Sequence, residues 1–157
     1  MTMRIAVVAL ASFAAVAQER PSEQLSAEKW FVGTWSCKGT ERQSGHAIAD
    51  TTTFSMELGG SWLQERITAG GRTLVEGFAG WDGVQHVRYD FLIGGMARLT
   101  SKGFNGDTIV FEGERMVGRQ KQAMKHTITK KGENAFQSAF EIEGKTAFEE
   151  TCTRRQD

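Results

Sequence analysis

From about Thr34 onward, apolar and polar residues alternate along the chain with a period of two. This spacing is typical of β-strands that bury one face, and the runs are rich in the Thr, Val, Ile and aromatic residues that strands favour. The pattern predicts ten strands, over Thr34–Glu41, Ala47–Leu58, Trp62–Ala69, Thr73–Trp81, His86–Ile93, Ala97–Gly103, Thr108–Glu114, Lys125–Lys130, Ala135–Glu141 and Lys145–Arg154.

Short turns rich in glycine separate these runs, among them Gly70-Gly71, Asp82-Gly83 and Asn105-Gly106. Short turns favour antiparallel neighbours, and a series of strands without intervening helices favours a meander that closes on itself. Closure also removes exposed strand edges, although a two-sheet sandwich is the alternative. We therefore predict an all-β, closed antiparallel up-and-down barrel of about ten strands. A short helix is expected before it, from Ser22 to about Phe31, with Pro21 at its start.

The first residues predict export. Arg4 precedes an uncharged apolar run from Ile5 to Ala17, which ends in the A-x-A pattern of a cleavage site. A membrane span would need about 20 apolar residues, and this run is shorter. We expect residues 1–17 to be a secretory signal peptide cleaved near Ala17/Gln18. Residues 18–157 should form a single barrel domain in a secreted or periplasmic protein.

The composition of the chain limits the classes of partner that it could bind. The whole chain has 19 basic and 19 acidic residues, and the basic ones form no extended cluster. Nucleic-acid binding usually needs a basic face, so we expect none. No later run is apolar enough to span a bilayer. The oligomeric state is left open by the sequence.

One register joins the first and last predicted strands. In an antiparallel pair the two residue numbers add to a constant. That constant is 189 both for Trp35 with Arg154 and for Cys37 with Cys152. All four side chains would share one face, and an Arg over a Trp ring contributes about 0.5–2 kcal/mol.

Export would place this cysteine pair in an oxidising compartment, so we predict a structural disulfide between Cys37 and Cys152. A reactive thiol or a metal pair is the weaker alternative, because neither cysteine has a histidine or a second cysteine nearby in sequence.

Several stretches, taken in order, resemble the bacterial family called domain of unknown function 1579. They are Glu57-Leu58-Gly59-Gly60-Ser61-Trp62-Leu63, Gly80-Trp81-Asp82, Gly106-Asp107-Thr108-Ile109-Val110-Phe111-Glu112-Gly113 and Glu150-Thr151-Cys152-Thr153-Arg154. The segment Phe31-Val32-Gly33-Thr34-Trp35-Ser36-Cys37-Lys38-Gly39-Thr40, with its Gly-x-Trp, is similar to the opening of calycin barrels and, more distantly, of nitrobindin-like barrels. The resemblance implies a lipocalin-like barrel. Cys37 stands where a nitrobindin-like barrel has glycine, and no histidine follows His126, so we expect no haem.

The three histidines, His46, His86 and His126, show no metal-binding spacing, and we predict no metal site and no cofactor. His46 and His86 lie beside turns and are expected to be exposed. His126 lies within a predicted strand and is the only candidate haem ligand.

Carboxylates supply the candidates for catalysis. If Trp35 points inward, Phe148 and Glu150 do so as well, and an inward Glu in an apolar barrel could act as a general acid or base. Glu150 and Glu65 are the only candidate catalytic residues. The alternative is that Glu150 pairs with Arg66, Arg98 or Arg154. No second catalytic group is defined, so the sequence leans against an enzyme without deciding the question.

Aromatic strand faces favour a binding function. A ten-stranded barrel has room for a small hydrophobic or amphipathic ligand, although a fully packed, purely structural barrel is the rival. The predicted lining residues are Phe54, Met56, Tyr89, Phe91, Phe111, Phe140, Phe148 and Glu150.

Overall fold

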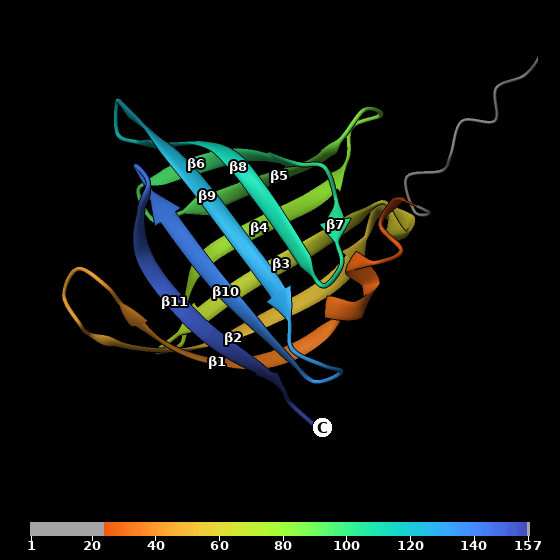
Figure 1. Ribbon diagram of the computed structural model, residues 1–157, viewed down its shortest axis with the longest axis horizontal. Helices are drawn as coiled ribbons and strands as arrows, with labels where there is room; N and C mark the ends of the chain where they lie inside the picture. Colours follow the sequence, from red (N-terminus) through yellow and green to blue (C-terminus); the bar gives the residue numbers. More distant parts are fainter. Residues whose placement is uncertain (1–23, 157) are drawn as a thin grey trace, which may run out of the picture.

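The computed structural model describes residues 24–156 as a barrel built from one antiparallel sheet (Figure 1). Strands adjacent in sequence pair with each other, except that β6 pairs with β8 and not with the short strand β7, and β1 pairs with β11. These pairings close the barrel, which confirms the predicted fold. The strands are β1 (Gly33–Glu41), β2 (Ala47–Glu57), β3 (Trp62–Ala69), β4 (Arg72–Trp81), β5 (His86–Leu92), β6 (Gly95–Ser101), β7 (Phe104–Asn105), β8 (Thr108–Val117), β9 (Gln120–Lys130), β10 (Ala135–Ile142) and β11 (Lys145–Arg154).

Two expectations need correction. The predicted helix over Ser22–Phe31 is reduced, within the described residues, to a turn and the 3-10 helix η1 (Glu28–Phe31). The predicted gap between Glu114 and Lys125 is in fact a hairpin, because β8 and β9 continue to a tight turn at Gly118. The predicted signal peptide lies outside the described residues.

The register between β1 and β11 is the predicted one. Trp35 faces Arg154 and Cys37 faces Cys152. The two cysteines form a disulfide, and both are fully buried. The Arg154 guanidinium lies 4.2 Å from the centroid of the Trp35 ring. The disulfide suggests an oxidising, extracellular or periplasmic compartment.

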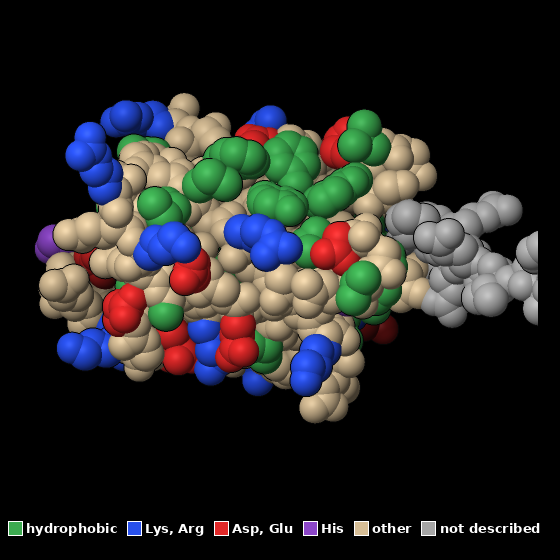
Figure 2. Space-filling view, turned by 90° about the horizontal axis from the view of Figure 1, so that it is seen from above, with side chains coloured by type: hydrophobic (Ala, Val, Ile, Leu, Met, Phe, Trp, Pro, Cys, Tyr) green, Lys and Arg blue, Asp and Glu red, His purple; other side chains and the backbone are tan. Residues whose placement is uncertain are grey.

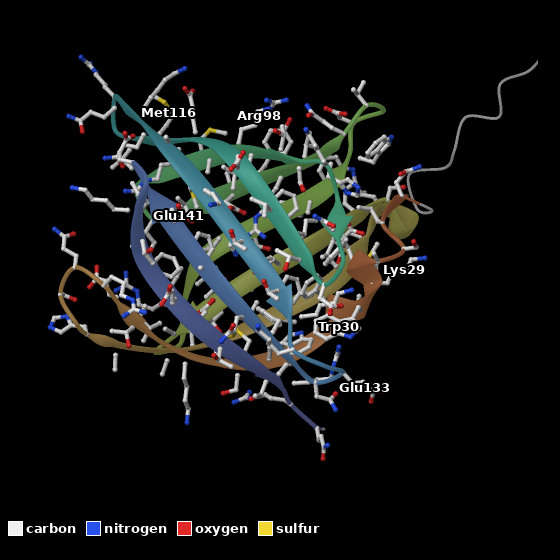
Figure 3. The ribbon with its side chains drawn as sticks, in the orientation of Figure 1. Lys29, Trp30, Arg98, Met116, Glu133 and Glu141 are labelled. Carbon is white, nitrogen blue, oxygen red and sulfur yellow. A yellow bond between two sulfur atoms is a disulfide. The ribbon has the colours of Figure 1, made fainter. Side chains whose placement is uncertain are left out.

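The segment from Leu25 to Val32 covers one end of the barrel, which we call the capped end (Figure 3, where Trp30 is labelled). Phe31 packs between Phe54 and Phe136, with ring centroids at 5.3 and 5.5 Å. Arg154 donates hydrogen bonds to the carbonyl oxygens of Trp30 and Val32. The last strand therefore fixes the segment that precedes the first. The opposite end, formed by the β1–β2, β3–β4, β5–β6, β8–β9 and β10–β11 turns, is called the far end.

The outer wall over β5, β6 and β8 carries a group of hydrophobic side chains (Figure 2). Phe91, Ile93 and Met96 are exposed there. Among residues 24–156, no helix is both long and apolar enough to cross a bilayer.

Glycine permits neighbouring strands to come unusually close where the wall bends. A Cβ on Gly39 would lie 2.0 Å from the Glu149 carbonyl oxygen of β11, and one on Gly113 would lie 2.2 Å from the Arg98 carbonyl oxygen of β6. Both contacts are far shorter than atoms tolerate. Glycine at inward positions is a recurrent way to bend strands into a barrel.

Replacing Gly39 with alanine should therefore lower the free energy of unfolding by about 1–3 kcal/mol, since the neighbouring backbone has to shift. Urea unfolding followed by tryptophan fluorescence measures this. Lys38→Ala, at the exposed neighbouring position, is the control and should change stability by no more than about 0.5 kcal/mol. Equal stabilities of the two variants would show that the bend does not depend on Gly39.

Candidate functional site

A belt of polar side chains crosses the middle of the barrel interior. On three strands a polar inward residue stands between two buried apolar ones: Glu65 between Leu63 and Ile67, His126 between Met124 and Ile128, and Ser138 between Phe136 and Phe140. We call the whole set the polar belt. Its members are Asp50, Glu65, Arg88, Asp90, His126, Ser138 and Glu150.

Arg88 is the centre of one half of the polar belt. Its Nε donates to both carboxylate oxygens of Asp90, at 2.8 and 3.0 Å, and its Nη2 donates to Glu65. All three side chains are buried. Burial would lower the pKa of Arg88, but the charges of Asp90 and Glu65 raise it. Burial raises the pKa of Glu65, and the positive charge of Arg88 opposes this effect.

The other half of the belt is a pair of carboxyl groups, Asp50 and Glu150, which lie within hydrogen-bonding reach of each other. Burial, followed by the nearby charges of Asp50 and Glu65, raises the pKa of Glu150 to about 8. Burial also raises the pKa of Asp50. Two carboxyl groups this close share a proton near neutral pH, since both cannot ionise without strong repulsion.

His126 is connected to this pair through Ser138. Its Nε2 lies 2.9 Å from the Ser138 hydroxyl, which also bonds Glu150. The Ser138 hydroxyl has one proton to donate. When Ser138 donates this proton to Glu150, its oxygen accepts a hydrogen bond from the Nε2–H of His126. Nδ1 is then an acceptor, and within residues 24–156 it has no hydrogen-bond partner although the side chain is 1% exposed. Burial and the charge of Arg88 lower the pKa of His126 well below its ordinary value, so the ring is neutral.

Replacing Glu150 with glutamine should change how stability depends on pH. The wild-type side chain has a folded pKa of about 8 against an ordinary value of 4.5, so the folded state holds a proton that the unfolded chain releases. Wild-type stability therefore falls as pH rises through this window, whereas the glutamine of the variant cannot ionise. We expect the free energy of unfolding of the variant, relative to that of the wild type, to increase by about 1–3 kcal/mol between about pH 4.5 and pH 8.5.

Chemical unfolding at a series of pH values checks this expectation. Glu149→Gln, on the outer face of the same strand, controls for the loss of one carboxylate. If the free energies of unfolding of the wild type and of Glu150→Gln changed with pH in parallel, the prediction that Glu150 shares a proton in the folded state would be contradicted.

Most of the predicted lining residues face the interior or pack against its core: Phe54, Met56, Phe111, Phe140, Phe148 and Glu150. Tyr89 and Phe91 were predicted wrongly. They alternate with the inward Arg88 and Asp90, so they point outward. Tyr89 packs near Trp62 on the outer wall, and Phe91 is 51% exposed. Sequence reasoning placed the aromatic residues of β5 inside because they are the more apolar set, whereas this strand buries its charged set.

The three arginines named as alternative partners of Glu150 lie elsewhere, and one of them, Arg98, is exposed on β6. Arg66 binds Glu76 on the outer wall, and Arg154 binds the backbone at the capped end. Alternation from Glu65 and Glu150 alone could not identify Arg88, Asp90 and Asp50. For Arg88 and Asp90, the register between β4 and β5 carries a signal. It places Gly77 opposite Asp90, and the absence of a side chain on Gly77 leaves room for the Arg88–Asp90 pair.

His86 is a further correction, because it is buried rather than exposed. Its Nδ1 lies 2.9 Å from a carboxylate oxygen of Glu28, and its ring packs against Trp81 at 5.1 Å. The segment at the capped end covers the turn beside His86, which sequence reasoning took to be open to solvent.

The donor set at the disulfide does not make a metal site in this state. The sulfur atoms of Cys37 and Cys152 and a Glu150 oxygen lie within 4.8 Å of one another, but the sulfurs are joined in the disulfide. His126, the predicted candidate haem ligand, is inward, with Phe140 stacked on its ring at 3.7 Å. Two grooves lie on the outer wall, one over β1, β10 and β11 and one over β6 and β8, and the lining of the second includes Met96 and Met116.

No protein-family model and no curated protein matches this chain. Among solved structures, Rv2717c from M. tuberculosis aligns with a TM-score of 0.56 and 10% identity over 85% of this chain and 98% of that one. A redesigned β-barrel, mFAP1, solved bound to DFHBI, aligns with a TM-score of 0.46 and 13% identity over 82% and 98% of the two chains. The similarity to Rv2717c supports the barrel fold.

Proposed function

We propose that this protein is an exported barrel that binds a small amphipathic molecule inside the barrel, with the polar head of the ligand at the polar belt. The apolar body of the ligand would lie against Phe111, Phe140 and Phe148. We also propose that the chain is a member of the family called domain of unknown function 1579. The signal-like first residues and the buried disulfide support export.

The observation that carries the proposal is the polar belt. A barrel with a purely structural role could fill its middle with apolar residues, as its neighbouring layers do. Burying several ionisable groups costs free energy unless each is paired, and an unpartnered acceptor such as His126 Nδ1 costs more. Convergent polar groups within an apolar interior are typical of small-molecule sites.

We place the route by which the ligand enters the barrel at the far end. There the inward side chains of Ile48, Val75, Leu92 and Phe148 are only partly buried, unlike those at the capped end. A ligand would enter by displacing these side chains, and the polar belt would stop its head. The capped end is closed by Phe31, Trp35 and Phe136.

Titration with a hydrophobic fluorescent probe tests binding, and native mass spectrometry of freshly purified protein shows whether a ligand accompanies it. The expected signal is saturable and competable. Phe148→Ala should change the probe affinity by about threefold or more, whereas the matched control Phe91→Ala on the outer wall should not. A signal that depends on Phe91 but not Phe148 would assign the probe to the outer wall and contradict the proposal.

A second function, acid–base catalysis, is favoured by one observation: Glu150 holds a proton near neutral pH and is connected through Ser138 to His126. A general acid needs such a proton at the operating pH. The Glu150→Gln variant separates the two functions. A binding protein keeps saturable ligand binding after this change, whereas an enzyme still binds its substrate and loses turnover.

A further inference from the structure

Building on the proposed function, we propose that the ligand is an organic cation, an ammonium group carried on an apolar body. The polar belt has an excess of negative charge and of hydrogen-bond acceptors, and a ligand has to supply what is missing. Charge, hydrogen bonding and the aromatic surroundings each point to this class.

The charge of the belt is unbalanced. Asp50, Glu65, Asp90 and Glu150 face a single cation, Arg88, which is already engaged by Glu65 and Asp90. Among residues 24–156, no ion pair includes Asp50 or Glu150, and the groups with the largest effects on Glu150 are Asp50 of β2, Glu65 of β3 and Ser138 of β10. On β1, the other neighbour of β11, the residue facing Glu150 is Gly39. The Asp50–Glu150 pair therefore lacks a positive partner.

The hydrogen-bonding capacity of the belt is unbalanced in the same direction. His126 Nδ1 has no hydrogen-bond partner in the described residues and is an acceptor in the tautomer whose Nε2–H donates to Ser138. The Asp50–Glu150 pair offers several carboxyl oxygens for one shared proton. An ammonium group carries donors and no acceptor, so it complements these groups. A carboxylate would add more acceptors and meet negative charge, and a hydroxyl would supply one donor without charge.

Aromatic rings lie beside this acceptor. Phe140 stacks on the His126 ring at 3.7 Å, and Phe148, which faces Phe140 from β11, lies 4.3 Å from it. Ring faces attract cations, and the same faces can hold an apolar body. A bare metal ion would use the carboxylates but not these rings, so we commit to an organic cation.

Binding of the cation has a defined proton balance. The proton shared by Asp50 and Glu150 leaves to solvent as the ammonium group takes its place, and no covalent bond of the ligand changes. Affinity should therefore rise as pH rises toward the range in which the pair loses its proton unaided. A neutral ligand of the same shape should show no such rise.

Isothermal titration with benzylamine, benzyl alcohol and benzoate tests the class, at about pH 6 and about pH 8.5 and in two buffers of different ionisation enthalpy. We expect benzylamine to bind about tenfold or more tighter than the other two at the higher pH. Its binding should release protons, and Glu150→Gln should remove the preference. Glu149→Gln, on the outer face of β11, is the matched control and should keep it. If Glu150→Gln fails to fold in a thermal melt, Asp50→Asn serves instead.

The outcomes are distinct. Equal binding of the three compounds, or tightest binding of benzoate, would overturn the inference and leave the proposed binding function standing. Absence of binding by all three, together with no saturable signal from the hydrophobic probe, would overturn the proposed function itself. Binding of Ca²⁺ or Zn²⁺ alone that excludes benzylamine would assign an inorganic cation and also overturn the inference.

Discussion

Replacing Arg88 with methionine should lower the free energy of unfolding by about 3–5 kcal/mol, because Glu65 and Asp90 would remain buried without their cation. The loss should depend on pH. Burial already raises the pKa of Glu65, and removing the opposing charge of Arg88 raises it further. A carboxyl group whose folded pKa is raised favours folding at low pH and loses that contribution as pH rises. The variant should therefore be least impaired in acid.

Urea unfolding at about pH 5 and about pH 8 measures both effects. Arg66→Met removes an exposed arginine that binds Glu76 on the outer wall and should cost no more than about 1 kcal/mol. A loss for Arg88→Met as small as this control, or one independent of pH, would show that the buried carboxylates do not depend on Arg88.

Removing the disulfide is the second large effect. Replacing Cys37 and Cys152 together with alanine should cost about 2–5 kcal/mol, since the bond joins residues 115 apart and restricts the unfolded chain. Because both cysteines are fully buried, a reductant should reach them only after unfolding.

Alkylation and mass spectrometry, with and without denaturant, would report this difference in access. The expected result is an unmodified folded protein and two modified cysteines in denaturant with reductant. Free thiols in the mature folded protein would contradict the bond itself, and unchanged stability of the double variant would show that the closure of the barrel does not rest on it.

The barrel could be predicted because its information is local and repeated. Alternation placed every long strand, and the Cys37 and Trp35 positions supplied the register between the first and last strands. The β8–β9 hairpin was missed because Arg115, Gln120 and Lys121 put polar residues on both faces near the turn, which hides the alternation.

The polar belt was predicted only in part, for a different reason. Glu65, Glu150 and His126 could be placed inward from their strands, but β5 reverses the usual rule by burying Arg88 and Asp90 and exposing Phe91. Such a strand is stabilised by ion pairs across the interior, in which Arg88 of β5 pairs with Asp90 of the same strand and with Glu65 of β3. That compensation is a property of the assembled barrel, so no single run of residues reveals it.

The pairing of β1 with β11 also sets the order in which this molecule can assemble. Contacts between strands so distant in sequence form slowly, because a long loop must close before they contribute. Until β11 is available, β1 and β10 each present an unpaired edge to other chains. The barrel therefore cannot be completed before β11 has been made, and the interval before β11 joins is when the chain is most exposed to aggregation.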